Sequence, residues 1–380
     1  MEPFCSAIYV PVLRLKTGEL QGLGLLADDV KRVIIPHLVV PPRGEREKEM
    51  ADLFSDSESV PGVGITLGRH WYGKQLLLNP RYLFADFGDE RCGDWLPRSF
   101  NIAREAGALA IPVATLTDLL SQRASAFKAS MGKSHNIRIA IDVSSDSLEA
   151  SPIESNIQDA LLSLDVTPEK VLVLIDFSQS DLSQPDVASG VIEGAFEVLE
   201  SFGRWGAIVY QGACYPESNP ALPCAHKTVP RNDWKSWLSC GFAESGLNSR
   251  YIYGDYAADC AKMQFGKKGG RPRRHFRYAT SEDWLVVRGA DEGSDEFVMR
   301  DVARRVVDSG CFAGRSFSVA DDFIYRLAEG AVSPGNASFW RAVNTGHHIT
   351  RVVRDIGRMK GMMFADLETE PLPKQLGLFN

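Results

Sequence analysis

The chain has 380 residues, of which 44% are hydrophobic and 24% are charged, and its formal net charge at pH 7 is −7. This composition excludes a chain that is disordered throughout, because so many apolar side chains can build a core. The acidic balance also argues against a generally basic nucleic-acid-binding protein. The cations are unevenly placed, however, and six of them form one segment: Lys267, Lys268, Arg271, Arg273, Arg274 and Arg277. A functional hypothesis has to explain this basic segment in an acidic chain.

The cysteines and the lengths of the apolar runs indicate the compartment. The chain has 7 cysteines at irregular spacing and no C-x-x-C pair, which fits free thiols in a cytosol better than a disulfide framework or a zinc site. Arg14 and Lys16 interrupt the apolar stretch Ala7–Leu13, so this segment is unlike a secretory signal. No apolar run reaches the roughly 18 residues that a transmembrane helix needs. We therefore expect a soluble cytoplasmic protein with no membrane partner.

Short apolar runs, each about as long as a buried strand, recur between residues 8 and 256. Most are rich in Val and Ile and show little alternation, as expected of parallel strands that are covered on both faces. The runs are Ile8–Leu13, Val33–Val40, Gln75–Leu78 leading on to Leu83–Asp86, Leu109–Val113, Ile137–Val143, Val171–Phe177, Gly206–Gln211 and Tyr251–Tyr256. Helical periodicity between them indicates βαβ units, and eight such strands match a (β/α)8 barrel in size. We predict an α/β fold of this TIM-like type, with an open doubly wound sheet as the alternative.

The helices predicted between these strands include Thr115–Lys128, Ser155–Leu164, Val187–Phe202 and Arg231–Gly241. After the eighth strand the pattern changes to a basic loop and a hairpin, and residues 266–290 are predicted to be an insertion. The two strands of this hairpin are predicted at Phe276–Thr280 and Trp284–Arg288. We expect one elaborated barrel domain over residues 1–362, followed by an extended tail over residues 363–380.

Further helices are predicted near the C-terminus. Asp295–Ser309 is strongly amphipathic, and we assign it as the eighth barrel helix. Val319–Ala331 and Ala337–Gly357 are predicted as extra helices within residues 310–362. Asn336 follows a Pro-Gly pair and is the expected N-cap of the second of these.

A series of motifs resembles a known family. In chain order the motifs are Tyr9-x-Pro11-x-Leu13-Arg14-x-Lys16-x-Gly18-Glu19, Ile34-Ile35-Pro36, Pro230-Arg231-x-Asp233-Trp234-x-x-Trp237, Gly254-Asp255-Tyr256, Phe317-Ser318-x-x-Asp321, Gly335-Asn336-x-Ser338-x-Trp340-Arg341 and His347-His348-Ile349-Thr350. The series resembles the "beta protein" family of phage and bacterial mobile-element genes over roughly residues 8–356. The resemblance implies a barrel-like fold and a setting in mobile elements or phage defence, and it implies no particular reaction. Val39 stands where the family pattern has an acidic residue, so a catalytic role for that acid is in doubt here.

Carboxylates end several of the predicted strands. Catalytic groups of a parallel barrel lie at the carboxyl ends of its strands, where we place Asp86, Asp142, Asp176 and Asp255. Asp142, Asp176 and Asp255 could bind Mg²⁺ or Mn²⁺, which prefer oxygen ligands. Together with Lys16 after strand one, they could instead supply a catalytic acid and base if mutual repulsion raises one pKa. The alternative is that each Asp caps the next helix or forms an Asx turn.

The basic segment follows the eighth strand and is expected on the same rim, where barrels commonly bind phosphate after strands seven and eight. Its arginines can hold a phosphate through two parallel hydrogen bonds. The candidate ligand-binding residues are Arg14, Arg231, Lys267, Lys268, Arg271, Arg273 and Arg274. They would contact a phosphorylated small molecule or a nucleic-acid backbone. The alternative is a solvated surface loop.

Two other features suggest chemistry but favour structural roles. His347 and His348 are adjacent in a predicted helix and therefore point about 100° apart, which suits a shared metal ion poorly. We expect one of them to be buried and hydrogen-bonded and the other to cap or pack. Cys214 ends the seventh strand, and no histidine lies near it in sequence, so we expect a structural thiol.

Three hypotheses for the function remain open. The first is a barrel protein of the beta family that acts in phage–host conflict and binds a phosphate-bearing ligand at its rim. If it is an enzyme, we expect a divalent-metal-dependent hydrolase or phosphodiesterase. The second is a non-catalytic module that senses a phage protein, peptide or nucleotide and signals to an operon-encoded partner. The third is a degenerate barrel whose outer helices form an assembly surface.

Overall fold

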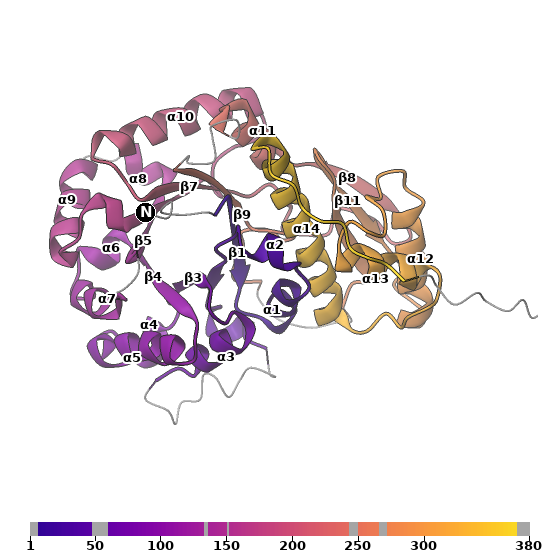
Figure 1. Cartoon of the computed structure of the whole chain (residues 1–380), viewed down its shortest axis with the longest axis horizontal. Helices are drawn as coiled ribbons and strands as arrows, with labels where there is room; N and C mark the ends of the chain where they lie inside the picture. Colours follow the sequence, from indigo (N-terminus) through magenta and orange to yellow (C-terminus); the bar gives the residue numbers. More distant parts are fainter. Residues whose placement is uncertain are drawn as a thin grey trace, which may run out of the picture.

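The computed structural model describes residues 7–47, 60–132, 136–149, 152–242, 250–265 and 272–370. Eight parallel strands close into a barrel in the order β1-β2-β3-β4-β5-β6-β7-β9 (Figure 1). Their bounds are β1 Tyr9–Arg14, β2 His37–Val39, β3 Gln75–Asn79, β4 Leu109–Thr115, β5 Ile139–Ser144, β6 Val171–Asp176, β7 Ala207–Gly212 and β9 Tyr251–Asp255. The barrel closes where β1 pairs with both β2 and β9. The predicted (β/α)8 barrel is confirmed.

Both faces of the barrel wall are buried, which explains why its strands are apolar without alternation. Side chains alternate between the two faces of a strand. On β1, Val10 belongs to the cluster that fills the barrel, and Tyr9 belongs to the cluster outside it. On β3, Leu77 points inward in the same way and Leu76 points outward.

Eleven helices before β9 cover or connect the strands, as far as the described residues go. They are α1 Thr17–Gly24, α2 Asp28–Lys31, α3 Val63–His70, α4 Phe84–Phe87, α5 Cys92–Glu105, α6 Leu116–Leu119, α7 Ala124–Ser130, α8 Ser145–Glu149, α9 Ile153–Leu164, α10 Pro185–Ser201 and α11 Asn232–Ser239, with the short 3₁₀ turns η1 Arg43–Glu45 and η3 Pro168–Lys170. The predicted continuation of the third strand over Leu83–Asp86 is wrong. Pro80 begins a turn, because its carbonyl accepts a hydrogen bond from the Leu83 N–H at 2.7 Å, and Asp86 lies in α4.

A second, smaller sheet lies beside the barrel (Figure 1). The predicted hairpin is confirmed as β10 (His275–Ala279) and β11 (Asp283–Arg288). A third strand, β8 (His226–Pro230), pairs antiparallel with β11 and completes the order β10-β11-β8. β8 comes from the connection between β7 and α11, so this sheet is built from two separate insertions into the barrel.

The helix assigned from sequence to the eighth barrel position belongs to this smaller sheet instead. α12 (Asp295–Val307) packs on β10, β11 and the helix α13 (Val319–Ala328). Its buried face, which includes Val298 and Val302, covers the hairpin, and Phe297 is 75% exposed rather than part of that face. The assignment of Asp295–Ser309 to the barrel was therefore wrong.

The 23-residue helix α14 (Ala337–Met359) takes the eighth position and joins the two parts (Figure 1). Its first half contributes Trp340 and Val343 to the apolar cluster of the smaller sheet. Its second half contributes Ile349 and Val352 to the cluster around the barrel. The predicted cap is confirmed, since the Asn336 side chain accepts a hydrogen bond from the Phe339 N–H at 3.0 Å.

Glycine allows α1 to approach α14 closely. A Cβ on Gly18 would lie 2.5 Å from the backbone oxygen of Ser338, and one on Gly22 would lie 2.8 Å from Cβ of Thr345. Neither distance is sterically possible, so these positions of α1 favour glycine.

In the part of the chain that the structure describes, no helix has the combination of length and apolarity needed to cross a membrane.

Candidate functional site

The interior of the barrel changes from apolar to polar toward the carboxyl ends of its strands. Ala140 on β5 and Leu174 on β6 belong to the apolar interior. Two residues further along, the next inward positions are Asp142 and Asp176, because strand side chains repeat every two residues. The mouth of the barrel at this end is therefore the first place to search for chemistry.

A buried polar layer lies beside these aspartates. His37 of β2 has one ring nitrogen 3.3 Å from the Asn79 amide and the other 3.0 Å from the Gln211 amide. All three side chains are buried. Burial, reinforced by the Arg81 charge, lowers the pKa of His37 to about 3. The imidazole is therefore neutral and fixed by two amides, which makes His37 a positioning group rather than a proton carrier.

Asp142 and Asp176 form the acidic pair of the mouth. β5 and β6 are hydrogen-bonded neighbours in which Asp142 pairs with Leu174 and Ser144 pairs with Asp176. The two carboxylates therefore stand on the same inner face, one step apart in register. Burial and then the Asp176 charge raise the pKa of Asp142 to about 7, against the lowering effect of Arg81. With this pKa the Asp142 carboxyl still carries its proton part of the time at neutral pH, as a general acid must.

A polar cavity of about 630 Å³ opens above this pair. Its walls come from the loops after β3, β6, β7 and β9, and they include Arg81, Asp176, Ser178, Tyr215, Tyr256 and Lys262. Asp176 accepts hydrogen bonds from the Ser178 N–H at 2.9 Å and from the Tyr256 hydroxyl at 3.3 Å. The Arg81 guanidinium lies over the Tyr82 ring. The cavity thus offers the Arg81 cation and the Asp176 carboxylate to a bound molecule, whereas Asp142 is the inward neighbour of Asp176 and is not part of the cavity lining.

Asp255 does not join this pair, because it faces the outside of the barrel wall. It accepts hydrogen bonds from the hydroxyls of Tyr9 at 2.5 Å and Tyr253 at 3.1 Å, and from the Ala257 N–H at 2.8 Å. Nε2 of His348 on α14 lies 2.8 Å from it and must donate, since a carboxylate only accepts. Burial acts to raise the pKa of Asp255, but these contacts lower it overall.

The predicted three-aspartate metal site is consequently not assembled. Asp142 and Asp176 face inward and Asp255 faces α14, and the described residues contain no group of three His, Cys, Asp or Glu side chains that could hold a metal ion. Asp86, the fourth predicted rim carboxylate, forms an ion pair with Arg46 from α4.

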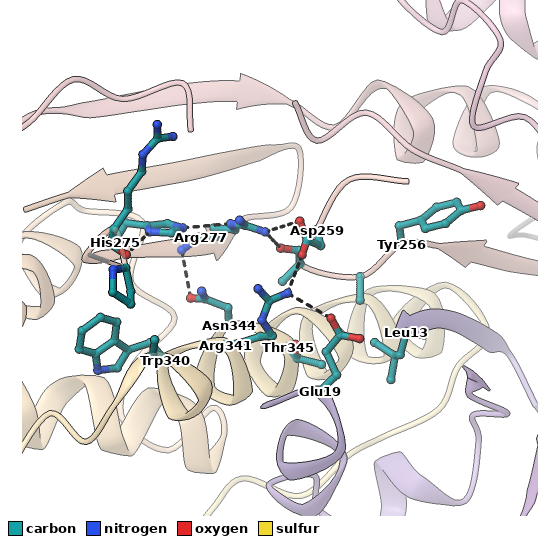
Figure 2. A pocket seen from close by; sticks show the side chains of 15 residues that line it. Leu13, Glu19, Tyr256, Asp259, His275, Arg277, Trp340, Arg341, Asn344 and Thr345 are labelled. Carbon is teal, nitrogen blue, oxygen red and sulfur yellow. Dashed lines mark hydrogen bonds and ion pairs between the residues drawn. The ribbon is translucent and has the colours of Figure 1, made fainter. Parts of the chain in front are cut away.

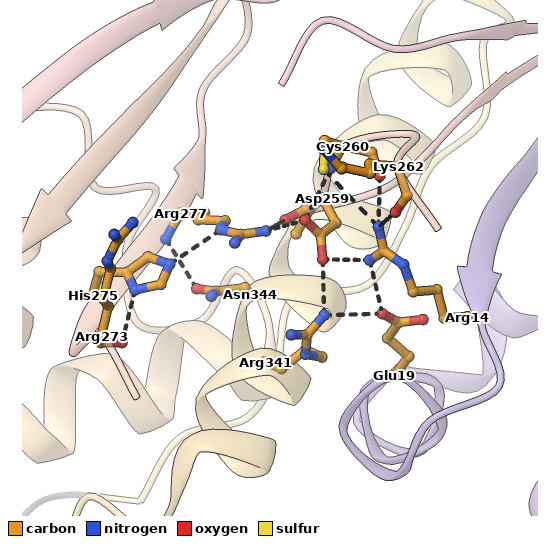
Figure 3. Close-up of polar contacts among 11 residues, drawn as sticks. Arg14, Glu19, Asp259, Cys260, Lys262, Arg273, His275, Arg277, Arg341 and Asn344 are labelled. Atoms are coloured by element: carbon orange, nitrogen blue, oxygen red, sulfur yellow. Dashed lines mark hydrogen bonds and ion pairs between the residues drawn. The ribbon is translucent and has the colours of Figure 1, made fainter. Parts of the chain in front are cut away.

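Arg14 belongs to a different charge cluster, at the junction between the barrel and the smaller sheet (Figure 3). Lys16 lies near the same cluster, within electrostatic reach of Arg341 and Glu19. Lys16 is 8% exposed and lies 3.8 Å from Glu45, and burial lowers its pKa. Arg14 forms an ion pair with Asp259 at 2.5 Å and donates to the carbonyls of Cys260 and Lys262. Arg14 therefore holds the loop after β9 in place and is not available to a ligand at the barrel mouth.

Asp259 is the centre of this cluster. Besides Arg14, it contacts Arg277 of β10 at 2.7 Å and Arg341 of α14 at 2.8 Å. Burial would raise the pKa of Asp259, but the three guanidinium groups lower it well below its usual range. Glu19 of α1 completes the cluster, 3.7 Å from Arg14 and 3.2 Å from Arg341. One loop, two helices and two strands are thus tied together by charge.

A second cavity, of about 220 Å³, lies next to this cluster (Figure 2). The loop after β9, the strand β10 and the first half of α14 enclose it, and Tyr256 lines both this cavity and the barrel mouth. Arg277, Arg341, Asn344 and Trp340 form much of its wall.

The other predicted ligand-binding residues are dispersed. Arg231 is buried, donates to the Thr280 carbonyl at 2.8 Å and lies between two tryptophans. Arg274 is also buried and donates to the Gly293 carbonyl at 2.8 Å. Arg273 is exposed and lines the second cavity. Lys267, Lys268 and Arg271 lie outside the described residues, so their predicted role stays a prediction.

The adjacent histidines of α14 are both buried, and each contacts a different aspartate. His347 lies 3.0 Å from Asp321 through Nδ1 and 2.8 Å from the Ala279 carbonyl through Nε2. Both ring nitrogens of His347 are therefore occupied, and the ring links α14 to α13 and β10. The expected buried histidine is found, but His348 is hydrogen-bonded too rather than merely packed.

Cys214 has the environment of an unreactive thiol. Its sulfur accepts a hydrogen bond from the Asp233 N–H at 3.0 Å. Burial, followed by the Asp233 charge, raises the pKa of the thiol well above its usual value. Since the thiolate is the nucleophilic form, this environment fits the structural role expected from the sequence.

Sequence reasoning missed several residues of the two cavities. The predicted third strand continued past Pro80 to Asp86, so its carboxyl end was placed at Asp86 and Arg81 was not considered as a rim residue. Glu19 and Arg341 lay within the family motifs but were given no role. Asp259 carried no signal, since its importance comes entirely from contacts with residues at least 18 positions away along the chain.

Comparison with known proteins agrees with the motif resemblance. A model of the family described as Beta protein matches residues 9–354, which is most of the chain. A search of curated proteins found no match.

Proposed function

The chain belongs to the Beta protein family, and we propose that the mouth of its barrel is the active site of a hydrolase that acts on a phosphate-bearing ligand. The observation that carries the proposal is the inward-facing pair of Asp142 and Asp176, of which Asp176 lines a polar cavity of about 630 Å³. The raised pKa of Asp142, mainly from burial, supports it, because this carboxyl can then carry a proton near neutral pH, as a general acid in hydrolysis does.

In this proposal each carboxyl group has one task. Asp176 takes a proton from a water molecule, whose oxygen forms the new bond to phosphorus. As the bond from phosphorus to the leaving oxygen breaks, Asp142 gives that oxygen its proton. Arg81 offsets the negative charge of the phosphate. Exchange with solvent then moves the proton from Asp176 to Asp142, and the pair returns to its starting state.

A divalent ion gives a second form of the same proposal. Mg²⁺ commonly keeps several waters and takes only one or two carboxylates together with substrate phosphates. Asp142 and Asp176 would suffice for such a site, without Asp255. Hydrolysis that needs Mg²⁺ or Mn²⁺ and stops on adding EDTA would favour this form, whereas hydrolysis that persists in EDTA would favour acid–base catalysis alone.

The same cavity would also serve a sensor that binds the ligand without cleaving it. Action in phage–host conflict and an operon-encoded partner both rest on the family resemblance and stay proposals. Binding and turnover separate the two functions: a ligand that raises the melting temperature but is never hydrolysed would favour the sensor.

The test is hydrolysis of chromogenic phosphomonoesters and phosphodiesters by the full chain and by two variants, Asp142→Asn and Asp176→Asn. Each variant is expected to lose about 10²- to 10⁴-fold in rate, the usual contribution of a general acid or base. Asp159→Asn, on the exposed side of α9, is the matched control and should keep full activity. Unchanged rates in both mouth variants would refute the proposed active site.

A further inference from the structure

The second cavity differs from the barrel mouth in its charge: cations outnumber carboxylates in its lining, whereas Arg81 and Lys262 are matched by Asp176 and Glu217 in the lining of the mouth. Around Asp259 and Glu19, two carboxylates face three guanidinium groups, those of Arg14, Arg277 and Arg341 (Figure 3). The cluster therefore holds an excess of positive charge in a partly buried place, which a bound anion would offset.

The groups that remain unused in this cavity are donors. Arg341 contacts both Asp259 and Glu19 through Nη1, and among the described residues its Nη2 and Nε have no partner. The Asn344 oxygen accepts from the Arg277 N–H at 3.0 Å, so the amide nitrogen is left to donate toward the cavity (Figure 2). Arg273 adds an exposed guanidinium at the edge.

The existing hydrogen bonds fix these donors in place. Nε of Arg277 donates to Nε2 of His275 at 3.1 Å, and Nδ1 of the same ring donates to the Arg273 carbonyl at 2.9 Å. His275 is therefore a neutral spacer that holds Arg277 and the backbone of Arg273 together. Preorganised donors of this kind cost little entropy when a ligand binds.

We propose that this cavity is a second binding site, distinct from the barrel mouth, for a small phosphate-bearing anion held by Arg341, Asn344 and Arg273. A volume of about 220 Å³ is below the roughly 300–1,000 Å³ of pockets for drug-sized ligands, so the ligand is small. Trp340 and Leu13 line the same cavity and offer an apolar wall to a short organic group attached to the phosphate.

The key variant is Asn344→Asp, tested with inorganic phosphate and pyrophosphate by calorimetry on the full chain. The new carboxylate keeps an acceptor for the Arg277 N–H but replaces the spare donor by a negative charge. We expect wild-type protein to bind at least one probe and Asn344→Asp to lose about tenfold or more in affinity, the effect of a lost charge-assisted hydrogen bond. Arg273→Gln should lose a few-fold, and Arg98→Gln, at an exposed arginine of α5, should bind as wild type.

Asp176→Asn separates this site from the proposed active site. Retained phosphate binding in Asp176→Asn, with loss in Asn344→Asp, supports the second site whether or not the mouth hydrolyses anything. Phosphate binding that is lost in Asp176→Asn and retained in Asn344→Asp overturns the second site. So does the absence of binding of either probe to wild-type protein up to about 10 mM. A third outcome would also overturn the proposal as stated. The wild-type protein would bind a short single-stranded oligonucleotide more tightly than pyrophosphate, and Asn344→Asp would lose that binding. The ligand would then be a nucleic-acid backbone rather than a small anion.

Discussion

Asp176 ends β6 and Asp255 ends β9, but their side chains face opposite sides of the same barrel wall. Asp176 looks into the polar mouth and keeps contact with a cavity. Asp255 is buried outside the wall and accepts four hydrogen bonds, one of them from α14. A strand-end aspartate can therefore serve chemistry or architecture, and the face it occupies decides which.

The largest effect should come from the outward aspartate. Asp255→Asn replaces one acceptor oxygen by a donor and leaves the contacts to His348 and Tyr253 mismatched. We expect it to lower the free energy of unfolding by about 3–5 kcal/mol, as when one partner of a buried polar pair is removed. Asp176→Asn should change it by less than about 1 kcal/mol. Denaturant titration measures both, and equal losses would break the distinction between the two faces.

The second prediction concerns how α14 reaches the barrel wall. Gly18→Ala adds a methyl group where the Ser338 carbonyl lies only 2.5 Å away. We expect a loss of about 1–3 kcal/mol from overpacking, even though alanine is the better helix former. Gly24→Ala in the same helix meets nothing within 4 Å and should be neutral or slightly stabilising. Matching melting temperatures for the two variants would mean that α1 and α14 can separate without cost.

The third prediction concerns the pH dependence of the inward pair. The pKa of Asp142 is raised, mainly by burial, to about 7 from an ordinary 3.8. Between about pH 4 and 7 the folded state keeps a proton that the unfolded chain has lost, so stability contributed by this group falls as the pH rises. Asn cannot ionise, and the melting temperature of Asp142→Asn should gain on wild type from pH 4 to 7 and level off above. For the control Asp159→Asn, melting temperature plotted against pH should run parallel to the wild-type plot. A parallel plot for Asp142→Asn as well would count against the raised pKa.

The barrel could be predicted because each of its strands is a continuous apolar run, and the two mouth aspartates because they directly end such runs. The eighth helix could not, since the apolar face of α12 does not reveal which sheet it covers. β8 gave no pattern because its residues are mostly exposed. The side of the barrel wall on which the Asp255 side chain lies depends on which residues of β9 point inward. The role of Asp259 depends on contacts with distant residues. Both are set by the tertiary fold.

The position of α14 has a consequence for how the protein is made. β1 and α1 leave the ribosome well before the helix that covers them, because that helix, Ala337–Met359, follows more than 300 residues later. At about 5–20 residues per second, the N-terminal wall waits from roughly a quarter of a minute to a minute for its partner. The glycine-lined face of α1 is uncovered during that time, so this part of the barrel wall stays without its covering helix long after the last barrel strand, β9, has been made.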